Sequence, residues 1–278
     1  MYIFLRSFLR KVFSTFNLGL VKNKDLVNLQ QTFIDFTCLL NKLNLYWLFD
    51  KKLDEIKSKS YSNINFLVES KSQNGQDLFA LLSNNFKRSG IFIEFGAYDG
   101  VIFSNTHLLE KQFGWTGILI DPIPNHYESM KQNRNCKLIH GAITAKHQES
   151  VLIEELPASD LSKFANKRKI FKKVHEVKAL TLQEVIDNNL TSNEIDFLSI
   201  DIEGEDIEIL KSLDLSRYKI KAICVEHNFR EGSDEIIGFM SKNGYDLVYG
   251  EVSKNDYWFV LQRWKSSDGV WISVGQSI

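Results

Sequence analysis

The sequence predicts an α/β fold in which a mostly parallel sheet of seven strands ends in an antiparallel hairpin. From about residue 90 onward, short apolar runs alternate with helical stretches, a pattern typical of parallel strands joined by right-handed crossovers. The last two strand-like runs are separated by only residues 250–256, which is too short for a parallel crossover and therefore predicts a hairpin. With 278 residues, 44% of them hydrophobic, the chain can form one large domain, and disorder is excluded.

The expected elements follow one another in a regular order. Residues 1–70 are predicted to form a helical appendage, residues 71–264 the main domain and residues 265–278 a tail. The seven strands are expected at residues 91–95, 117–120, 137–139, 195–200, 222–225, 245–249 and 257–261. Between them, helices are expected from about residue 104 to 114, from 125 to 134, after a capping box at 181–184, from 205 to 213, and up to Gly244.

The first 24 residues have an unusual charge pattern. They hold five Lys and Arg residues and no acidic residue, and their apolar side chains recur at helical spacing. Such a helix can lie on an anionic membrane surface; the alternative is that it packs on the main domain or on a partner. A cleaved signal peptide is disfavoured because charges interrupt the apolar run.

Charge and cysteine content limit the other partners. The 34 basic and 35 acidic side chains almost cancel, so the positive excess of a dedicated nucleic-acid binder is missing. Three widely spaced cysteines include no CxxC pair, which favours a reducing compartment. We therefore expect a cytoplasmic protein, peripheral to the inner face of the membrane if residues 1–24 bind there. The basic stretch Lys163–Lys173 is expected to be a solvated helical face, with a patch for an anionic, lipid-linked acceptor as the alternative.

The turn after the first predicted strand is expected to hold a ligand, because open α/β sheets bind ligands at the carboxyl ends of their strands. It follows an E-x-G-x-x-x-G pattern, in which Gly96 would let the backbone approach the ligand and Gly100 would permit a tight turn. The G-x-G-x-x-G pattern of dinucleotide folds is absent, and Glu94 and Asp99 flank the turn. Two carboxylates repel a pyrophosphate and suit a cationic ligand such as S-adenosylmethionine.

Two further positions favour the same ligand. Asp121 ends the second predicted strand, 21 positions after Gly100, where an acid can accept both ribose hydroxyls. Small residues follow the third strand and can admit a flat adenine, and the terminal hairpin distinguishes a methyltransferase-like sheet from an ordinary dinucleotide-binding one. The residues expected to bind the cofactor are Glu94, Gly96, Ala97, Asp99, Gly100, Asn105, Asp121, Pro122, Ala142 and Asp201.

A set of short motifs resembles the FkbM family of S-adenosylmethionine-dependent methyltransferases. The motifs stand in the family's order over roughly residues 72–262, at Ser72–Asp77, Phe92–Gly100, Ser104–Thr106, Gly114–Gly117, Asp121–Pro122, Ser199–Gly204 and Glu226–Asn228. The chain departs from the family at Asp121, where Glu is frequent, and at Tyr98, where Asn is frequent. The resemblance implies a Rossmann-like methyltransferase fold and O-methylation of a hydroxyl, commonly of a sugar in a bacterial glycan or polysaccharide or of a secondary metabolite.

Groups suited to activate an acceptor hydroxyl follow the fourth and fifth predicted strands. An alcohol must lose its proton to a base or bind a metal before it attacks a methyl group. In one mechanism His227 is the general base and Asp201 or Glu226 orients it. In the other, Asp201, Glu226 and Asn228 bind Mg²⁺ or Mn²⁺. We favour the mechanism in which His227 is the general base.

The sequence therefore predicts an S-adenosylmethionine-dependent O-methyltransferase whose acceptor is a free or lipid-linked sugar hydroxyl. Two other readings stay open. One is an NAD-dependent Rossmann oxidoreductase, and the other is a catalytically silent scaffold docked on a membrane.

Overall fold

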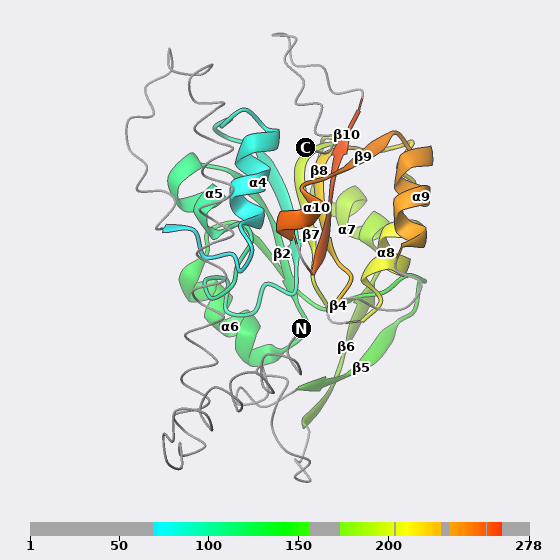
Figure 1. The fold of residues 1–278 in the computed structure, drawn as a ribbon. Coiled ribbons are helices and arrows are strands. Elements are labelled where there is room, and N and C mark those ends of the chain that lie inside the picture. Colours follow the sequence, from blue (N-terminus) through cyan, green and yellow to red (C-terminus); the bar gives the residue numbers. More distant parts are fainter. Residues whose placement is uncertain (1–68, 156–172, 203, 229–233, 254, 263–278) are drawn as a thin grey trace, which may run out of the picture.

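The computed structural model describes residues 69–155, 173–202, 204–228, 234–253 and 255–262 (Figure 1). Nearly all of the expected N-terminal appendage, the C-terminal tail and most of the basic stretch lie outside these ranges. Lys173 alone of that stretch is described, and it begins a strand rather than continuing a helix. Within the described ranges, no helix is both long and apolar enough to cross a bilayer.

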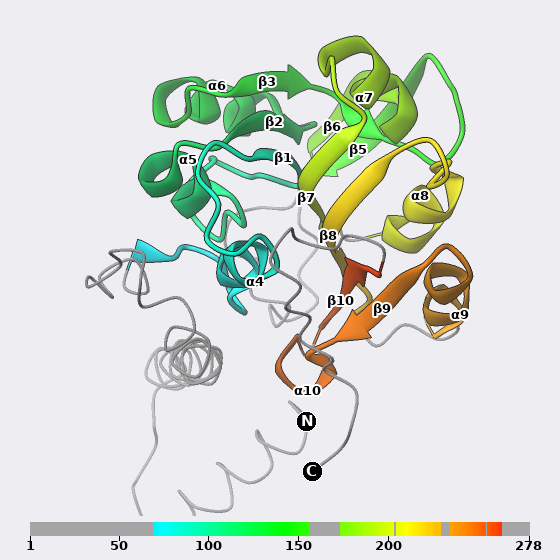
Figure 2. The ribbon, with the colours of Figure 1, turned by 90° about the horizontal axis from the view of Figure 1, so that it is seen from above.

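A seven-stranded sheet forms the centre of the fold (Figures 1 and 2). Its strands are β1 (Ile91–Phe95), β2 (Thr116–Asp121), β3 (Lys137–His140), β7 (Glu194–Ile200), β8 (Lys219–Glu226), β9 (Tyr245–Val248) and β10 (Asp256–Leu261). They lie in the order β3-β2-β1-β7-β8-β10-β9, and every neighbouring pair is parallel except the two pairs that involve β10. The predicted fold class is thus confirmed, and the structure adds that β10 lies between β8 and β9.

Helices cover both faces of this sheet (Figure 2). On one face, α4 (Gln76–Ser83), α5 (His107–Phe113) and α6 (Pro124–Asn133) pack on buried side chains such as Phe92 and Phe197. On the other face, α7 (Leu182–Asn189), α8 (Asp206–Ser212) and α9 (Glu235–Lys242) pack on Ile93, Leu198 and their neighbours. Alternate residues of each strand therefore belong to different halves of the core, as the two-residue period of a strand requires.

Sequence signals explain several of the helix ends. The capping box at α7 is present, with the Thr181 hydroxyl accepting from the backbone of Glu184 and the Glu184 carboxylate accepting from the backbone of Thr181. Helix α5 ends at Gly114, whose φ of 67° is the left-handed conformation that favours glycine. A short helix that was not predicted, α10 (Gly250–Ser253), occupies the connection between β9 and β10.

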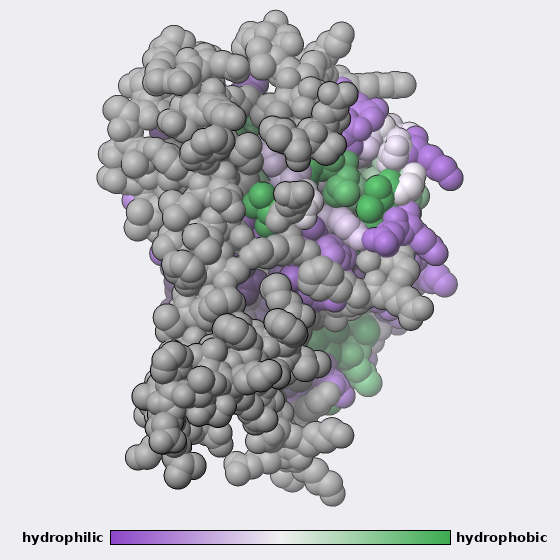
Figure 3. Space-filling model, in the orientation of Figure 1, coloured by the Kyte–Doolittle hydropathy of each residue, from purple (hydrophilic) through white to green (hydrophobic). Residues whose placement is uncertain are grey.

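A second, three-stranded sheet was also not predicted. It consists of β4 (Ala142–Ile143), β5 (Ser150–Glu155) and β6 (Lys173–Leu180), in the order β4-β6-β5. Strands β5 and β6 pair antiparallel, and β6 pairs parallel with β4, which follows β3 almost directly. The outer face of this sheet carries Leu152 and Val174, each more than half exposed, and Figure 3 shows hydrophobic surface where β5 and β6 lie.

Candidate cofactor and acceptor site

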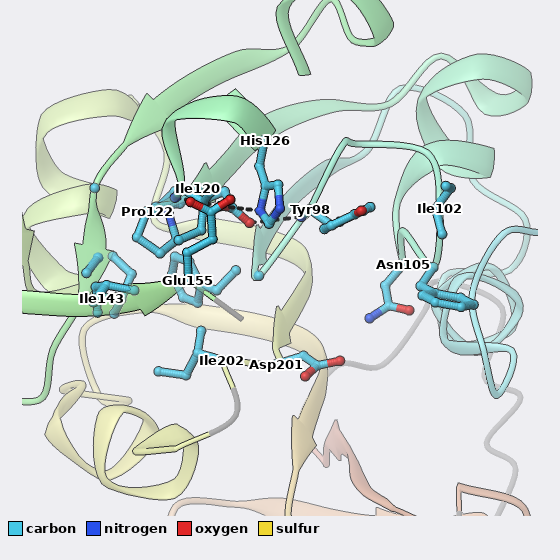
Figure 4. Close-up of a pocket in the computed structure, with 18 of the residues that line it drawn as sticks. Tyr98, Ile102, Asn105, Ile120, Pro122, His126, Ile143, Glu155, Asp201 and Ile202 are labelled. Carbon is cyan, nitrogen blue, oxygen red and sulfur yellow. Dashed lines mark hydrogen bonds and ion pairs between the residues drawn. The ribbon is translucent and has the colours of Figure 1, made fainter. Parts of the chain in front are cut away.

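A pocket of about 360 Å³ opens at the carboxyl ends of β1, β2 and β7 (Figure 4). The strand order reverses here, because the chain runs outward from β1 to β3 and then crosses to β7 on the other side. Open α/β sheets place their ligands at this position. The lining residues that matter below are Gly96, Tyr98, Ile102, Phe103, Asn105, Asp121, Pro122, His126, Ala142, Ile143, Ile153, Glu154, Glu155, Asp201 and Ile202.

Asp121 stands at the end of β2 with its carboxylate held from three directions. Oδ2 accepts the backbone N–H of Tyr98 at 3.0 Å, Oδ1 accepts that of Ile123 at 2.9 Å, and Nδ1 of His126 lies 3.0 Å from Oδ1. The His126 ring also packs against the ring of Tyr98, with 4.3 Å between centroids. These contacts fix the orientation of a carboxylate that lines the pocket, which a hydroxyl-binding acid needs.

Gly96 lines the pocket, but the close approach at this glycine is to the chain itself. A Cβ added there would lie 1.8 Å from the carbonyl oxygen of Asp201, at the end of β7. The φ of Gly96 is 73°, which also favours glycine. Glycine at this position therefore allows β1 and β7 to end close together, whereas the sequence suggested only an approach of ligand to backbone.

Glu94 does not line the pocket. Its buried carboxylate accepts from the backbone of Asn105 at 2.7 Å and from the hydroxyls of Ser104, at 3.0 Å, and Thr106. Burial raises the pKa of Glu94, while the nearby positive charge of Arg134 acts in the opposite direction. Glu94 thus holds the segment that carries Asn105, which does line the pocket.

Three other predicted cofactor residues shape the turn rather than the pocket surface. The carbonyl of Ala97 accepts the backbone N–H of Gly100 at 2.8 Å. The Asp99 carboxylate accepts from the backbone of Val101 and Ile102 at 2.8 and 2.7 Å. The turn is also tied to α6, because Arg134 donates to the carbonyl of Gly100 at 2.9 Å.

Arg134 is a buried residue whose importance the sequence did not indicate. Besides Gly100 it contacts Glu110, Ser104 and Thr106, at 2.8, 3.1 and 3.0 Å. Its side chain has no exposed surface. Arg134 therefore links α5, the end of α6 and the residues on both sides of Asn105 into one buried polar network.

Asn105 carries a buried polar atom with no hydrogen-bond partner in the described structure. Its Nδ2 lies 2.9 Å from the hydroxyl of Ser199 on β7, while its Oδ1 has no partner. Buried carbonyl oxygens are nearly always hydrogen-bonded, so an orphaned one beside a pocket indicates a donor on a ligand. Figure 4 shows Asn105 and Asp201 at one end of the pocket and Pro122, Ile143 and Ile202 at the other.

The residues expected to activate the acceptor are only partly brought to this pocket. Asp201 lines it, whereas Glu226 and His227 are buried beyond its described lining. The ring of His227 stacks on that of Tyr257 at 4.1 Å, and its backbone N–H donates to the carbonyl of Asn255 at 2.8 Å. Asn228 donates to the same carbonyl at 3.1 Å. Glu203, an acid within the motif Ser199–Gly204, lies outside the described residues.

The donor set expected for a metal does not assemble. In the ranges that the structure describes, no three His, Cys, Asp or Glu side chains lie close enough together to hold a metal ion. Asp201 lines the pocket and Glu226 and Asn228 do not. The metal mechanism therefore finds no support in the arrangement of the described side chains.

The charge of the pocket is distinctive. Four carboxylates line it, those of Asp121, Glu154, Glu155 and Asp201, and no Lys or Arg is among the described lining residues. Two of these acids, Glu154 and Glu155, come from β5 of the three-stranded sheet β4-β6-β5, here called the accessory sheet. The sequence did not indicate them, nor did it indicate His126 on α6. Glu154 directly follows the apolar run Val151–Ile153 and Glu155 comes next, and that position is the one signal that could have indicated acids at a strand end.

Comparisons with known proteins agree with this arrangement. A family model described as a methyltransferase FkbM domain matches residues 94–247. No curated protein matches the chain. Three solved structures are similar to the chain at low sequence identity.

The methyltransferase FkbM from Methylobacillus flagellatus KT is 11% identical, with a TM-score of 0.38 and coverage of 62% of this chain and 43% of that chain. A SAM-dependent methyltransferase from Geobacter sulfurreducens in complex with S-adenosyl-L-homocysteine is 10% identical, with a TM-score of 0.34 and coverage of 65% and 67%.

The third, a precorrin-6y C5,15-methyltransferase from Geobacter metallireducens GS-15, is 11% identical, with a TM-score of 0.38 and coverage of 66% and 84%. Likenesses this distant carry no argument about the site. The family model, however, spans more than half of the 278 residues, and several of the motifs resembling that family contribute residues to the pocket, among them Gly96, Asn105, Asp121 and Asp201. The chain belongs to the FkbM family of methyltransferases and has the Rossmann-like fold of S-adenosylmethionine-dependent enzymes.

Proposed function

We propose that this protein transfers a methyl group from S-adenosylmethionine to a hydroxyl oxygen of a sugar, in a glycan or polysaccharide. The observation that carries the cofactor assignment is the charge of the pocket, with four carboxylates and no Lys or Arg among its described lining residues. S-adenosylmethionine brings a sulfonium and an ammonium group, which such a pocket attracts, whereas the pyrophosphate of NAD would be repelled.

The polarity of the pocket supports the same ligand. The apolar end, with Ile143 and Ile202, suits a flat adenine, and the carboxylate of Asp121, which also lines the pocket, suits the ribose hydroxyls. Asn105 Oδ1 at the other end suits an ammonium donor. When bound, the cofactor supplies an electrophilic methyl group on its sulfonium. The part of the chain is to position that group, to exclude water and to accept the proton of the acceptor hydroxyl.

The rim near Asn105 supports an acceptor with an apolar face. Ile102 and Phe103 line the pocket mouth, and each is about half exposed. The turn that carries them is fixed by the Asp99 carboxylate and by the contact of Arg134 with Gly100. A sugar ring presents C–H groups on one face and hydroxyls at its edge, so it can lie on such an apolar rim while one hydroxyl points inward.

For the proton acceptor, Asp201 and His227 are the candidates. Asp201 already lines the pocket, and His227 follows the adjacent strand β8. In this proposal His227 takes the proton of the acceptor hydroxyl, and a carboxylate orients its imidazole ring.

Calorimetric titration of the purified protein tests the cofactor assignment. We expect S-adenosylmethionine and S-adenosylhomocysteine to bind and NAD not to bind. Tight binding of NAD without binding of either adenosyl ligand would overturn the proposal. Methyl transfer from labelled S-adenosylmethionine to a panel of nucleotide sugars and glycans then tests the acceptor class. Binding of the cofactor with no transfer to any acceptor would instead favour the catalytically silent scaffold.

A further inference from the structure

The accessory sheet contributes a wall to the cofactor pocket. Ile153 and Glu155, two positions apart on β5, share one face of that strand, and both line the pocket. This sheet is fixed to the pocket by the pairing of β6 with β4, in which Ala142 and Ile143 pair with Ala179 and Leu180. Ala142 and Ile143 themselves line the pocket, so β5 has a defined position relative to it.

Glu155 is held in place by a histidine on the neighbouring strand. Nε2 of His175 lies 2.6 Å from Oε2 of Glu155, and the His175 side chain is only 10% exposed. This hydrogen bond lowers the pKa of Glu155. At neutral pH the pocket therefore receives a fixed, ionised carboxylate from β5.

Glu155 lies where an adenine bound at the apolar end of the pocket would need a hydrogen-bond acceptor. Adenine has apolar faces, but its exocyclic amine needs a hydrogen-bond acceptor when it is buried. Figure 4 shows Glu155 beside Pro122, on the side of the pocket where Ile143 and Ile202 lie and away from Asn105. Asp121 already accepts from Tyr98, Ile123 and His126 in addition to its assignment to the ribose. The turn after β3, Gly141-Ala142, offers no acidic side chain.

We propose that Glu155, positioned by His175, accepts a hydrogen bond from the exocyclic amine of the adenine and so selects adenosine-containing ligands. This inference rests on the proposed function, because it names a contact within the S-adenosylmethionine site. Glu155 is then a specificity-determining residue, and His175 acts through it.

Two ligands that differ at the amine test the contact. S-adenosylhomocysteine carries the amine, and S-inosylhomocysteine carries a carbonyl oxygen at the same place. We expect the wild-type protein to prefer S-adenosylhomocysteine by roughly tenfold or more, the range of a hydrogen bond to a charged group. In the Glu155→Ala variant this preference should fall to near unity, and in the isosteric Glu155→Gln variant it should be intermediate.

The outcomes separate this inference from the proposed function. If the wild type binds neither ligand, both fail. If it binds S-adenosylhomocysteine but Glu155→Ala keeps the wild-type preference for the amine, only the Glu155 assignment is overturned. A 2′-deoxyribose analogue of S-adenosylhomocysteine provides a further check. If Glu155 contacted the ribose instead of the amine, the Glu155→Ala variant would bind this analogue as tightly as it binds S-adenosylhomocysteine.

Matched variants control for stability and test His175. Glu176→Gln lies on the outer face of the same hairpin, where Glu176 contacts Ser150, and it should leave both dissociation constants unchanged. His175→Ala should reduce the preference for the amine, and His175→Gln, whose amide can still donate to Glu155, should restore part of it. Equal loss with Ala and Gln would contradict the positioning role of His175.

Discussion

Replacement of Gly96 by alanine should damage both stability and cofactor binding. The added Cβ would lie 1.8 Å from the carbonyl oxygen of Asp201, far inside the normal contact distance between carbon and oxygen. Because the clash is with backbone at the end of β7, no side-chain rotation can relieve it. Either β1 and β7 separate at their carboxyl ends or the turn moves, and both changes displace atoms that line the pocket.

The loss of unfolding free energy in Gly96→Ala has two parts, and a control variant can separate them. A non-glycine residue at φ 73° costs about 1 kcal/mol, and forcing additional volume into a packed site costs about 1–3 kcal/mol more. Gly114 has a similar φ of 67°, but a Cβ added there would meet nothing within 4 Å. Gly114→Ala should therefore show the backbone cost alone, and Gly96→Ala both costs.

The assay combines urea unfolding with calorimetric binding of S-adenosylhomocysteine. We expect Gly96→Ala to lose about 2–4 kcal/mol of unfolding free energy and to bind at least tenfold more weakly than wild type. Gly114→Ala should lose about 1 kcal/mol and bind normally. If the two variants had the same stability and the same affinity, the approach of β1 to β7 at Gly96 would not constrain the site as argued.

Four further predictions concern Asp256, Asp121, His227 and residues 1–24. Burial raises the pKa of Asp256 to about 6. Relative to Asp256→Asn, which can still accept from Gln76, the unfolding free energy of the wild type should therefore fall by about 2 kcal/mol as pH rises from 4 to 7. Equal urea-unfolding profiles of the two proteins would contradict this. Asp121→Ala should weaken S-adenosylhomocysteine binding by at least tenfold in calorimetry, since both ribose hydroxyls lose their acceptor. If His227 is the base, His227→Ala should abolish turnover with unchanged cofactor affinity, and normal turnover would reject that role. Deletion of residues 1–24 should release the protein from anionic liposomes if this segment binds membranes, as sedimentation would show.

The strand ends were predictable because their pattern is local. A short apolar run followed by Gly96 or Asp121 specifies a parallel strand and the residue at its carboxyl end, and the sheet brings such ends together. The antiparallel pairing of the last two strands also followed from the connection length, since a short loop cannot make a parallel crossover.

The strand period explains why Glu94 does not line the pocket. Glu94 shares its face of β1 with Phe92, which packs in the half of the core that contains α5. Its carboxylate is therefore directed to Ser104 and Thr106, and it reaches the pocket only through the segment it holds. Arg134, His126 and Glu155 were missed for another reason, since they come from elements whose place beside the pocket is set by tertiary packing.

The position of β10 has a consequence for the order in which the protein is completed. Strand β8 is hydrogen-bonded to β10 along residues 222–226, and β9 pairs only with β10 in the described sheet. Until residues 256–261 have left the ribosome, β8 has an open edge and β9 has no place in the sheet. An open, hydrophobic strand edge is a template for wrong pairing. The nascent chain is therefore exposed to aggregation until β10 is made, and a chain truncated near residue 255 would keep an open edge on β8.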